Sequence, residues 1–300
     1  MPSKTYSLGL IGYPLGHSHS PQIHGAALRA LGISGAYTLY PVSPDTSPTS
    51  TREREERLTL DGLLAQLRAG KIHGLNVTIP HKQNVIPLLD KLTPAAQAIG
   101  AVNTIFLQNS VLIGDNTDAP GFWRDLQQLE VRGEGRVRFA LVLGAGGSAR
   151  AVTYALLTHG YQVKIAARRV EQGQELCNQL SEINDSISTT SNPLSAIKLS
   201  STSITNIQSP ITLIVNTTPI GMHPNENASP WPPEISLPKN AAIYDLVYNP
   251  RETLLVKQAR AVGLLASTGM GMLVEQAALA FERWTELEAP RNVMRQVVGE

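Results

Sequence analysis

A glycine-rich turn near the middle of the 300-residue chain constrains the fold more than any other feature. The apolar run Arg138–Leu143 leads into the turn, which spans residues 144–150 and reads Gly-Ala-Gly-Gly-Ser-Ala-Arg. Helix-forming residues follow as far as Gly160, and a second apolar run occupies residues 161–166. The order strand, glycine turn, helix and strand within about 30 residues is typical of the start of a dinucleotide-binding α/β fold.

Other apolar runs indicate parallel sheets in both halves of the chain, because strands buried on both faces read as continuous apolar segments. The length suggests about two domains. We therefore predict an α/β protein with one α/β domain over residues 1–119 and a Rossmann-type, doubly wound domain over residues 120–269. The pattern of residues 273–284 predicts a helix but does not place it. Further strands are predicted at residues 6–12, 74–79, 211–216 and 241–246, and a helix is predicted at 61–69.

Composition and charge exclude several classes of protein. Lysine and arginine number 25 and aspartate and glutamate 24, so a net charge of +1 gives no field that favours nucleic acid or an anionic membrane. No window approaches the 18 or more apolar residues of a membrane span, and the first apolar stretch is too short for a signal peptide. Cys177, the single cysteine, excludes a disulfide framework and suits a reducing compartment. We expect a cytoplasmic protein.

The glycine turn predicts where a dinucleotide binds. Gly144 would permit the tight turn, Gly146 would let backbone N–H groups approach a pyrophosphate, and Ala149 would allow close packing of helix on strand. A glycine turn without a ligand is the competing interpretation, and the flanking strand and helix make it the weaker one. The predicted turn residues are Gly144, Ala145, Gly146, Gly147, Ser148 and Ala149.

The residues after the second strand select the form of the cofactor. An NAD site needs an acidic side chain there to accept from the ribose 2′-hydroxyl, but this chain has Ala167-Arg168-Arg169. Two guanidinium groups can bind a 2′-phosphate by charge-assisted hydrogen bonds. We therefore predict NADP(H) rather than NAD(H); an exposed arginine pair with no ligand is the alternative.

Polar residues cluster at predicted strand ends in the first domain, where open α/β folds place ligands. Ser18 and Ser20 precede a helix that Pro21 would open, so their hydroxyls suit a carboxylate, although Ser20 could instead cap that helix. Thr78 and Lys82 follow the strand at 74–79; taken alone, Lys82 would be a surface lysine. Three nearby histidines do not align within one helical turn, so no metal site is expected: His17, His19 and His24.

These residues together resemble the shikimate dehydrogenase family, whose members reduce 3-dehydroshikimate to shikimate with NADPH. The matching segments occur in order along nearly the whole chain, and their joint occurrence is specific. They are residues 16–21, 76–82, 100–104, 116–118, 144–150, 216–222, 245–250 and 271–277.

The resemblance implies a role for each matching residue. Lys82 and Asp118 would form the catalytic pair at the reacting oxygen, with Tyr248 near the substrate. Ser18 and Ser20 would hold the substrate carboxylate, and residues 1–119 would form the substrate domain, to which residues 270–300 return. The ring hydroxyls would be bound by Asn76, Thr78, Asn103 and Gln276, and the nicotinamide end of the cofactor would be seated by Leu246 and Gly269.

The chain departs from the family pattern at three places. Gly25 replaces the asparagine that usually follows the histidine of the Ser-Pro-x-x-His segment. Ala167 and Arg169 replace the usual neighbours of Arg168, which leaves the contacts to the adenine ribose open. The serine-, proline- and charge-rich segment 42–59 is longer than the family leads us to expect and has no assigned role.

Two alternatives to an NADP-dependent shikimate dehydrogenase remain at this level. One is a quinate/shikimate dehydrogenase of the same fold that uses NAD, against which Arg168 argues. The other is a catalytically silent dinucleotide sensor, against which the presence of both Lys82 and Asp118 argues. The expected partner is a small-molecule substrate; a homodimer is an option that the sequence leaves open.

The arginine pair gives a first testable prediction. Arg168→Ala should weaken NADPH binding by about 1.5–3 kcal/mol, because a hydrogen bond to a charged group is lost. NADH has no 2′-phosphate, so its affinity should change little. Titration of both nucleotides against wild type and variant measures the ratio, and an unchanged ratio would contradict the assignment of Arg168.

Overall fold

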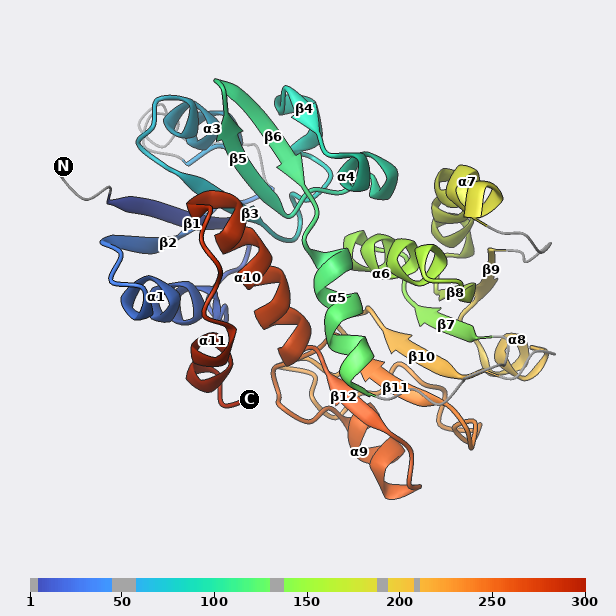
Figure 1. Cartoon of the computed structure of the whole chain (residues 1–300). Helices are drawn as coiled ribbons and strands as arrows, with labels where there is room; N and C mark the ends of the chain where they lie inside the picture. The colour runs from blue at the N-terminus through green and yellow to red at the C-terminus, as the bar shows by residue number, and fades with distance from the viewer. Residues whose placement is uncertain (1–4, 45–57, 130–137, 188–193, 208–210) are drawn as a thin grey trace, which may run out of the picture. The chain divides into compact units, whose positions relative to one another are not determined.

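The computed structural model describes residues 5–44, 58–129, 138–187, 194–207 and 211–300 (Figure 1). The chain divides into two compact units, of which the first combines Met1–Thr117 with Gln276–Glu300 and the second is Asp118–Glu275. Both are α/β units, as predicted. The charge-alternating part of segment 42–59 lies outside the described residues. No helix within the described ranges is long and apolar enough to cross a membrane.

The described residues of the first unit form a six-stranded mixed sheet in the order β2-β1-β3-β5-β6-β4. β1 is parallel to β2 and to β3, whereas β5 runs antiparallel to both β3 and β6. The carboxyl ends of β1 and β3 therefore meet at one edge, where the predicted substrate residues follow them. The strands are β1 Tyr6–Gly12, β2 Gly35–Pro41, β3 Gly74–Val77, β4 Lys91–Leu92, β5 Thr104–Gln108 and β6 Val111–Asp115.

Side-chain caps and prolines fix where the helices of this unit begin. Thr59 accepts a hydrogen bond from the backbone N–H of Gly62 at the start of α3, and Thr93 accepts one from Ala96 at the start of α4. Pro21 lies in the first turn of α1, where its missing N–H costs nothing. The elements are α1 Ser20–Ala30, α3 Leu60–Arg68, η1 Ile86–Leu88 and α4 Pro94–Ile99.

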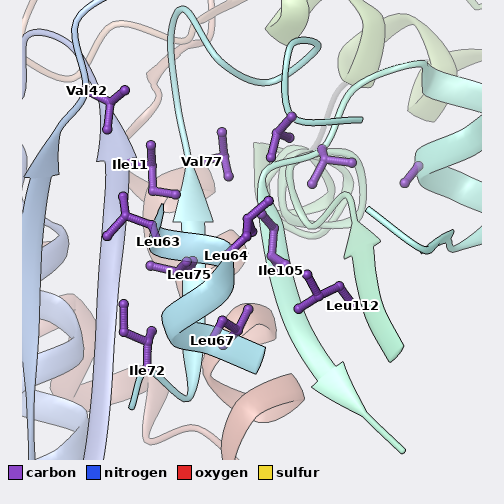
Figure 2. Close-up of a cluster of buried hydrophobic side chains, with 13 residues drawn as sticks. Ile11, Val42, Leu63, Leu64, Leu67, Ile72, Leu75, Val77, Ile105 and Leu112 are labelled. Atoms are coloured by element: carbon purple, nitrogen blue, oxygen red, sulfur yellow. The ribbon is translucent and has the colours of Figure 1, made fainter. Parts of the chain in front are cut away.

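One face of the sheet is covered by α3, which buries a row of leucines at helical spacing. Leu63, Leu64 and Leu67 pack against strand residues that include Leu75 and Ile105 (Figure 2). Each of these five residues is exposed by 4 % or less. Burial of this apolar surface is the main stabilising contribution to this half of the unit.

The C-terminal helices complete the other face. Trp284, near the end of α10 (Met270–Thr285), packs with Leu8 of β1 and donates its indole N–H to the Ile105 carbonyl at 3.1 Å. A Cβ on Gly74 would collide with the Trp284 ring, so this strand position requires glycine. The last helix, α11 (Arg291–Val297), packs against α1.

In the part of the second unit that the structure describes, six parallel strands follow the order β12-β11-β10-β7-β8-β9. Read from the other edge, this is the doubly wound order 3-2-1-4-5-6 of dinucleotide-binding sheets. The order reverses between β7 and β10, and the glycine turn follows β7. The strands are β7 Phe139–Leu143, β8 Gln162–Ala167, β9 Ser195–Lys198, β10 Leu213–Asn216, β11 Ala242–Asp245 and β12 Ala266–Thr268.

The serine-, threonine- and asparagine-rich composition of residues 181–210 predicts one strand and long loops. The strand is present as β9, but α7 continues to Ile187 and the short helix α8 forms after the Ser200 cap. Residues 188–193 and 208–210 of this stretch lie outside the described residues. The helices of the unit are α5 Asp118–Leu126, η2 Gln127–Leu129, α6 Gly147–Thr158, α7 Val170–Ile187, α8 Ser201–Thr205 and α9 Leu254–Ala261.

A fully buried histidine lies between α1 and the sheet of the first unit. The ring of His24 is stacked on the Tyr37 ring, with 4.3 Å between centroids and 3° between planes, and lies 5.3 Å from the Trp284 ring. The polar neighbour of the His24 ring is the Asn76 side chain, whose hydrogen bond favours the protonated ring more weakly than burial disfavours it. Burial lowers the pKa of His24 from 6.5 to about 3, so the folded protein holds this imidazole neutral.

This burial predicts a pH-dependent stability. The unfolded imidazole binds a proton below about pH 6.5, whereas the folded one does not, so stability is present above that pH and is lost as the pH falls toward 3. Between pH 7 and pH 5 the loss from this group should be about 2 kcal/mol. His24→Phe keeps an aromatic ring but cannot titrate, so its denaturant midpoint should fall less over that range. If the denaturant midpoints of wild type and His24→Phe fall equally between pH 7 and pH 5, the titration of His24 does not cause the loss of stability.

Candidate functional site

Ser18 and Ser20 lie at the end of the loop that joins β1 to α1. Ser20 is the first residue of the helix rather than its cap, since the cap position belongs to His19, whose side chain makes no capping bond. The Ser20 backbone N–H donates to the Ser18 hydroxyl at 3.3 Å, which holds the two residues together. Both hydroxyls thus stand at the positive end of a helix, which is suited to a carboxylate.

Lys82 follows β3 through a tightly bonded turn. The His81 backbone N–H donates to the Thr78 carbonyl at 2.9 Å, and the Lys82 carbonyl accepts from the Val102 N–H at 2.8 Å. The buried His81 ring is in hydrogen-bond contact with the Val42 carbonyl at 2.6 Å. These contacts fix the backbone at Lys82, and its side chain is half-buried.

Three of the residues predicted to bind the substrate lie in one hydrogen-bonded network. The Asn76 amide nitrogen donates to the Asn103 carbonyl at 3.0 Å and to the Thr104 hydroxyl at 3.2 Å. The Asn103 amide nitrogen in turn donates to the Thr117 hydroxyl at 2.9 Å and to Gln276 Oε1 at 3.4 Å. Asn76 and Asn103 are buried, so these bonds form in a setting where an unmet amide would be costly.

A buried carboxylate anchors the turn that leads to Asp118. Asp115 accepts from the Thr93 hydroxyl at 2.7 Å, from the Asn116 backbone N–H at 2.8 Å and from Arg283 Nε at 3.0 Å. Because Arg283 lies on α10, this ion pair also holds the C-terminal helix on the first unit. Asp118 is the first residue of α5 and is buried.

In the second unit, the glycine turn has the geometry that close approach to a phosphate requires. Gly144 has φ of +110°, and a side chain there would lie 2.6 Å from the Thr217 hydroxyl. Gly146 caps α6, and a side chain there would meet no atom within 4 Å, so the space before the helix is open. Gly147 and Ser148 form the first turn of α6. Ala149 is fully buried, as close helix–strand packing demands.

The residues predicted to select the cofactor stand at the end of β8. Ala167 is the last residue of the strand and is buried. Arg168 and Arg169 follow it and are exposed, so both guanidinium groups are open to solvent. α7 begins directly after them at Val170.

Leu246 and Gly269, predicted to seat the nicotinamide, do lie together. A Cβ on Gly269 would collide with the Leu246 carbonyl, and the Leu246 N–H donates to the Asn216 carbonyl at 2.9 Å. Tyr248 follows two residues later, and burial raises the pKa of its hydroxyl. The backbone of this segment is therefore set by β10 and by the approach of Gly269.

The side chain of Asp245 also holds the segment 246–248 in place. Its carboxylate accepts from Asn216 Nδ2 at 2.8 Å, the Val247 N–H at 3.0 Å and the Thr253 hydroxyl at 2.7 Å. Burial nevertheless raises the pKa of Asp245 to about 6, and the hydrogen bonds act in the opposite direction.

The predicted residues are thus divided between the units. The first unit holds Lys82 and the substrate residues apart from Tyr248; the second holds Asp118, Tyr248 and every predicted cofactor residue. The pairing of Lys82 with Asp118 stays a prediction. Among the described residues, no group of three or more His, Cys, Asp or Glu side chains is arranged to hold a metal ion.

Several supporting residues were not singled out from the sequence. Tyr37, Thr104 and Asp115 belong to the substrate-side network, and Asn216 and Thr253 belong to the cofactor side. Thr104 and Asn216 lie within matching segments and Asp115 directly precedes one, which was a usable signal. Tyr37 gave none, because it is one of eight tyrosines and its partner is 39 residues away.

A doubly wound parallel sheet with a glycine turn at its switch point, joined to a second α/β unit that carries a lysine and clustered amides, defines a nucleotide-dependent dehydrogenase with two domains. Comparison with known proteins specifies the family. The family described as "Shikimate dehydrogenase substrate binding domain" matches residues 10–105, and "Shikimate 5'-dehydrogenase C-terminal domain" matches residues 269–298. The chain belongs to the shikimate dehydrogenase family.

Individual relatives cover nearly the whole chain. The NADP(+) shikimate dehydrogenase of Carboxydothermus hydrogenoformans is 38 % identical over 99 % of this chain and 97 % of its own. The shikimate 5-dehydrogenase of Thermus thermophilus, solved with NADP(H) and shikimate, is 34 % identical with a TM-score of 0.78 over 98 % of each chain. A quinate dehydrogenase of Corynebacterium glutamicum, solved with NAD, is 31 % identical with a TM-score of 0.81 over 98 % of each.

The hydrogen bond between Thr253 and Asp245 can be tested for its contribution to stability. Thr253→Val removes a donor to the buried carboxylate and the hydroxyl that caps α9, so it should lower the free energy of unfolding by about 1–3 kcal/mol. Thr253→Ser keeps the oxygen and should retain most of the stability. Chemical denaturation measures both variants, and a larger loss in Thr253→Ser than in Thr253→Val would show that the methyl group, not the hydroxyl, matters.

Proposed function

We propose that this protein catalyses the reversible, NADP-dependent reduction of 3-dehydroshikimate to shikimate, a step of aromatic amino acid and chorismate biosynthesis. The observation that carries the proposal is the buried network in which Asn76, Asn103 and Gln276 are hydrogen-bonded together. Family resemblance assigns these amides to the ring hydroxyls of the substrate. A polyhydroxylated ring needs several fixed amides at one place, and the first unit offers them.

The remaining substrate contacts follow from charge and position. The Ser18 and Ser20 hydroxyls and the N-terminal end of α1 would bind the carboxylate of the ring. Thr78, whose backbone N–H is bonded to the Ile11 carbonyl at 2.8 Å, would contribute a further hydroxyl from the end of β3. Tyr248 would lie near the substrate.

Reduction of a ring ketone delivers a hydride to carbon and a proton to oxygen. Bound NADPH supplies the hydride. Lys82 would stand at the carbonyl oxygen, where its positive charge stabilises the developing alkoxide and its ammonium group can donate the proton. Asp118 would orient Lys82 and share the proton transfer. The turn bonds at Thr78 and Val102 would keep the lysine backbone fixed during the reaction.

The residues of the second unit fit NADP. The space before α6 is open at Gly146, which allows a pyrophosphate to meet the first N–H groups of the helix. Arg168 and Arg169 are exposed at the end of β8, where the ribose 2′-phosphate would lie. Leu246 and Gly269 would lie against the nicotinamide.

A quinate dehydrogenase is the second candidate, because a solved enzyme of that type with NAD shares the fold at a TM-score of 0.81. The exposed arginine pair after β8 favours NADP over NAD and so favours the shikimate enzyme. Steady-state oxidation of shikimate and of quinate, each with NADP+ and with NAD+, separates the two. Turnover highest with shikimate and NADP+ supports the proposal, whereas preference for quinate and NAD+ refutes it.

The cellular setting remains a proposal as well. The cytoplasm is the compartment that suits a single buried, unpaired cysteine, and burial raises the pKa of Cys177 to about 11, which keeps the thiol unreactive. A homodimer stays an open option.

Lys82→Ala should lower kcat about 10²-fold or more, because the group that stabilises and protonates the reacting oxygen is removed. NADPH binding should stay nearly intact, since Lys82 lies on the substrate unit. Stopped-time assays at saturating substrate give kcat, and nucleotide titration gives the affinity. A variant that keeps most of its turnover would remove Lys82 from the chemistry.

A further inference from the structure

We propose that Tyr37 is a positioning residue of the substrate site: its hydroxyl fixes the Asn76 side chain so that Asn76 presents an oxygen to a hydroxyl group of the substrate. The inference rests on the proposed function and adds a residue and a recognition rule to it. Tyr37 does not itself touch the substrate in this account.

The hydrogen bonds of Asn76 determine which way its amide points. The Asn103 carbonyl can only accept, so the group 3.0 Å from it must be the Asn76 nitrogen. The second hydrogen of that nitrogen goes to the Thr104 hydroxyl at 3.2 Å. The amide oxygen then faces Tyr37, whose hydroxyl donates to it at 2.8 Å.

The amide oxygen is the end of Asn76 that faces hydrogen-bond donors, because its neighbours are the Tyr37 hydroxyl and the His24 ring. Both amide hydrogens have acceptors, and one of the two lone pairs of the oxygen is taken by Tyr37. The oxygen can only accept hydrogen bonds. Asn76 therefore selects a donor, such as a ring hydroxyl, and disfavours a carbonyl or ether oxygen at the same place.

The Tyr37 ring is itself held in place. β2 and β1 pair in parallel with Tyr37 opposite Leu8, and Leu10 of β1 lies opposite Asn76 of β3. Side chains alternate between the faces of a sheet, so Tyr37 and Asn76 share a face, and the tyrosine reaches across β1. The His24 ring stacks flat on the Tyr37 ring at 4.3 Å, which fixes its plane.

Ser20 adds a second link between Tyr37 and the substrate residues. Burial raises the pKa of the Tyr37 hydroxyl, and a side-chain hydrogen bond with Ser20 lowers it. The same tyrosine oxygen is thus a neighbour of one residue assigned to the carboxylate and of one assigned to a ring hydroxyl.

Tyr40 provides a matched control on the same strand. It lies three residues after Tyr37, so it faces the opposite side of the sheet, where it packs against the cluster around Ile11 and covers Gly9. Tyr40→Phe therefore removes a hydroxyl from the same strand at a distance from Asn76.

The test compares Tyr37→Phe with Tyr40→Phe in steady-state oxidation of shikimate. Tyr37→Phe should raise KM for shikimate about 2- to 12-fold, the range of one neutral hydrogen bond, because Asn76 is no longer held. The kcat and the KM for NADP+ should both stay within about twofold of the wild-type values, a change smaller than the loss of one hydrogen bond produces. Tyr40→Phe should change none of the three.

Thermal unfolding of both variants separates positioning from stability, because a purely structural role of the hydroxyl would lower the melting temperature without raising KM for shikimate selectively. In an Asn76→Ala background, Tyr37→Phe should raise KM no further, since the tyrosine acts through the asparagine. Equal KM values for Tyr37→Phe and Tyr40→Phe, or an additive effect on Asn76→Ala, would overturn the inference. An inactive wild type would instead refute the proposed function.

Discussion

The buried side chain of Asn103 links the two places where the chain passes from one unit to the other. Its amide nitrogen binds Thr117 and Gln276, the residues at the two places where the chain passes between the units. Its amide oxygen accepts from the Thr117 N–H at 2.7 Å. One buried amide thus fixes both chain crossings and, through its own carbonyl, the orientation of Asn76. Buried networks of this kind specify one arrangement, because any other leaves amides unmet.

The sequence predicted the elements whose signals are local. Continuous apolar runs identified β1, β7 and β8 to within a residue or two, and the glycine turn located the switch point of the second sheet. The helix at 61–69 appears as α3, one residue earlier at each end. Residues 181–187 were wrongly read as loop, because polar composition hides the helical continuation of α7 when one face is solvated.

Sequence motifs named individual residues of the candidate site but not the network of hydrogen bonds that joins them. Asn76, Asn103 and Gln276 could be named from their motifs, yet the bonds that join them span 27 and 173 positions along the chain. Tyr37 could not be named, because its proposed role arises from the pairing of β2 with β1 and from the reach of its ring across β1. Such contacts depend on which strands lie side by side, and a local sequence pattern does not predict that.

In the second unit, the segments next to the two unit boundaries, which begin at Asp118 and end at Glu275, are also held by side-chain contacts. α5 starts at Asp118 and carries Asp125, which accepts a hydrogen bond from the fully buried Tyr244 of β11. Arg124 of the same helix lies 3.9 Å from Glu275, the last residue of α10 in this unit. Asp118 therefore begins a helix bonded to the central sheet, and Thr117 before it is bonded to Asn103. A carboxylate with fixed backbone on both sides loses little entropy in orienting a partner, which is the property that the proposed role of Asp118 requires.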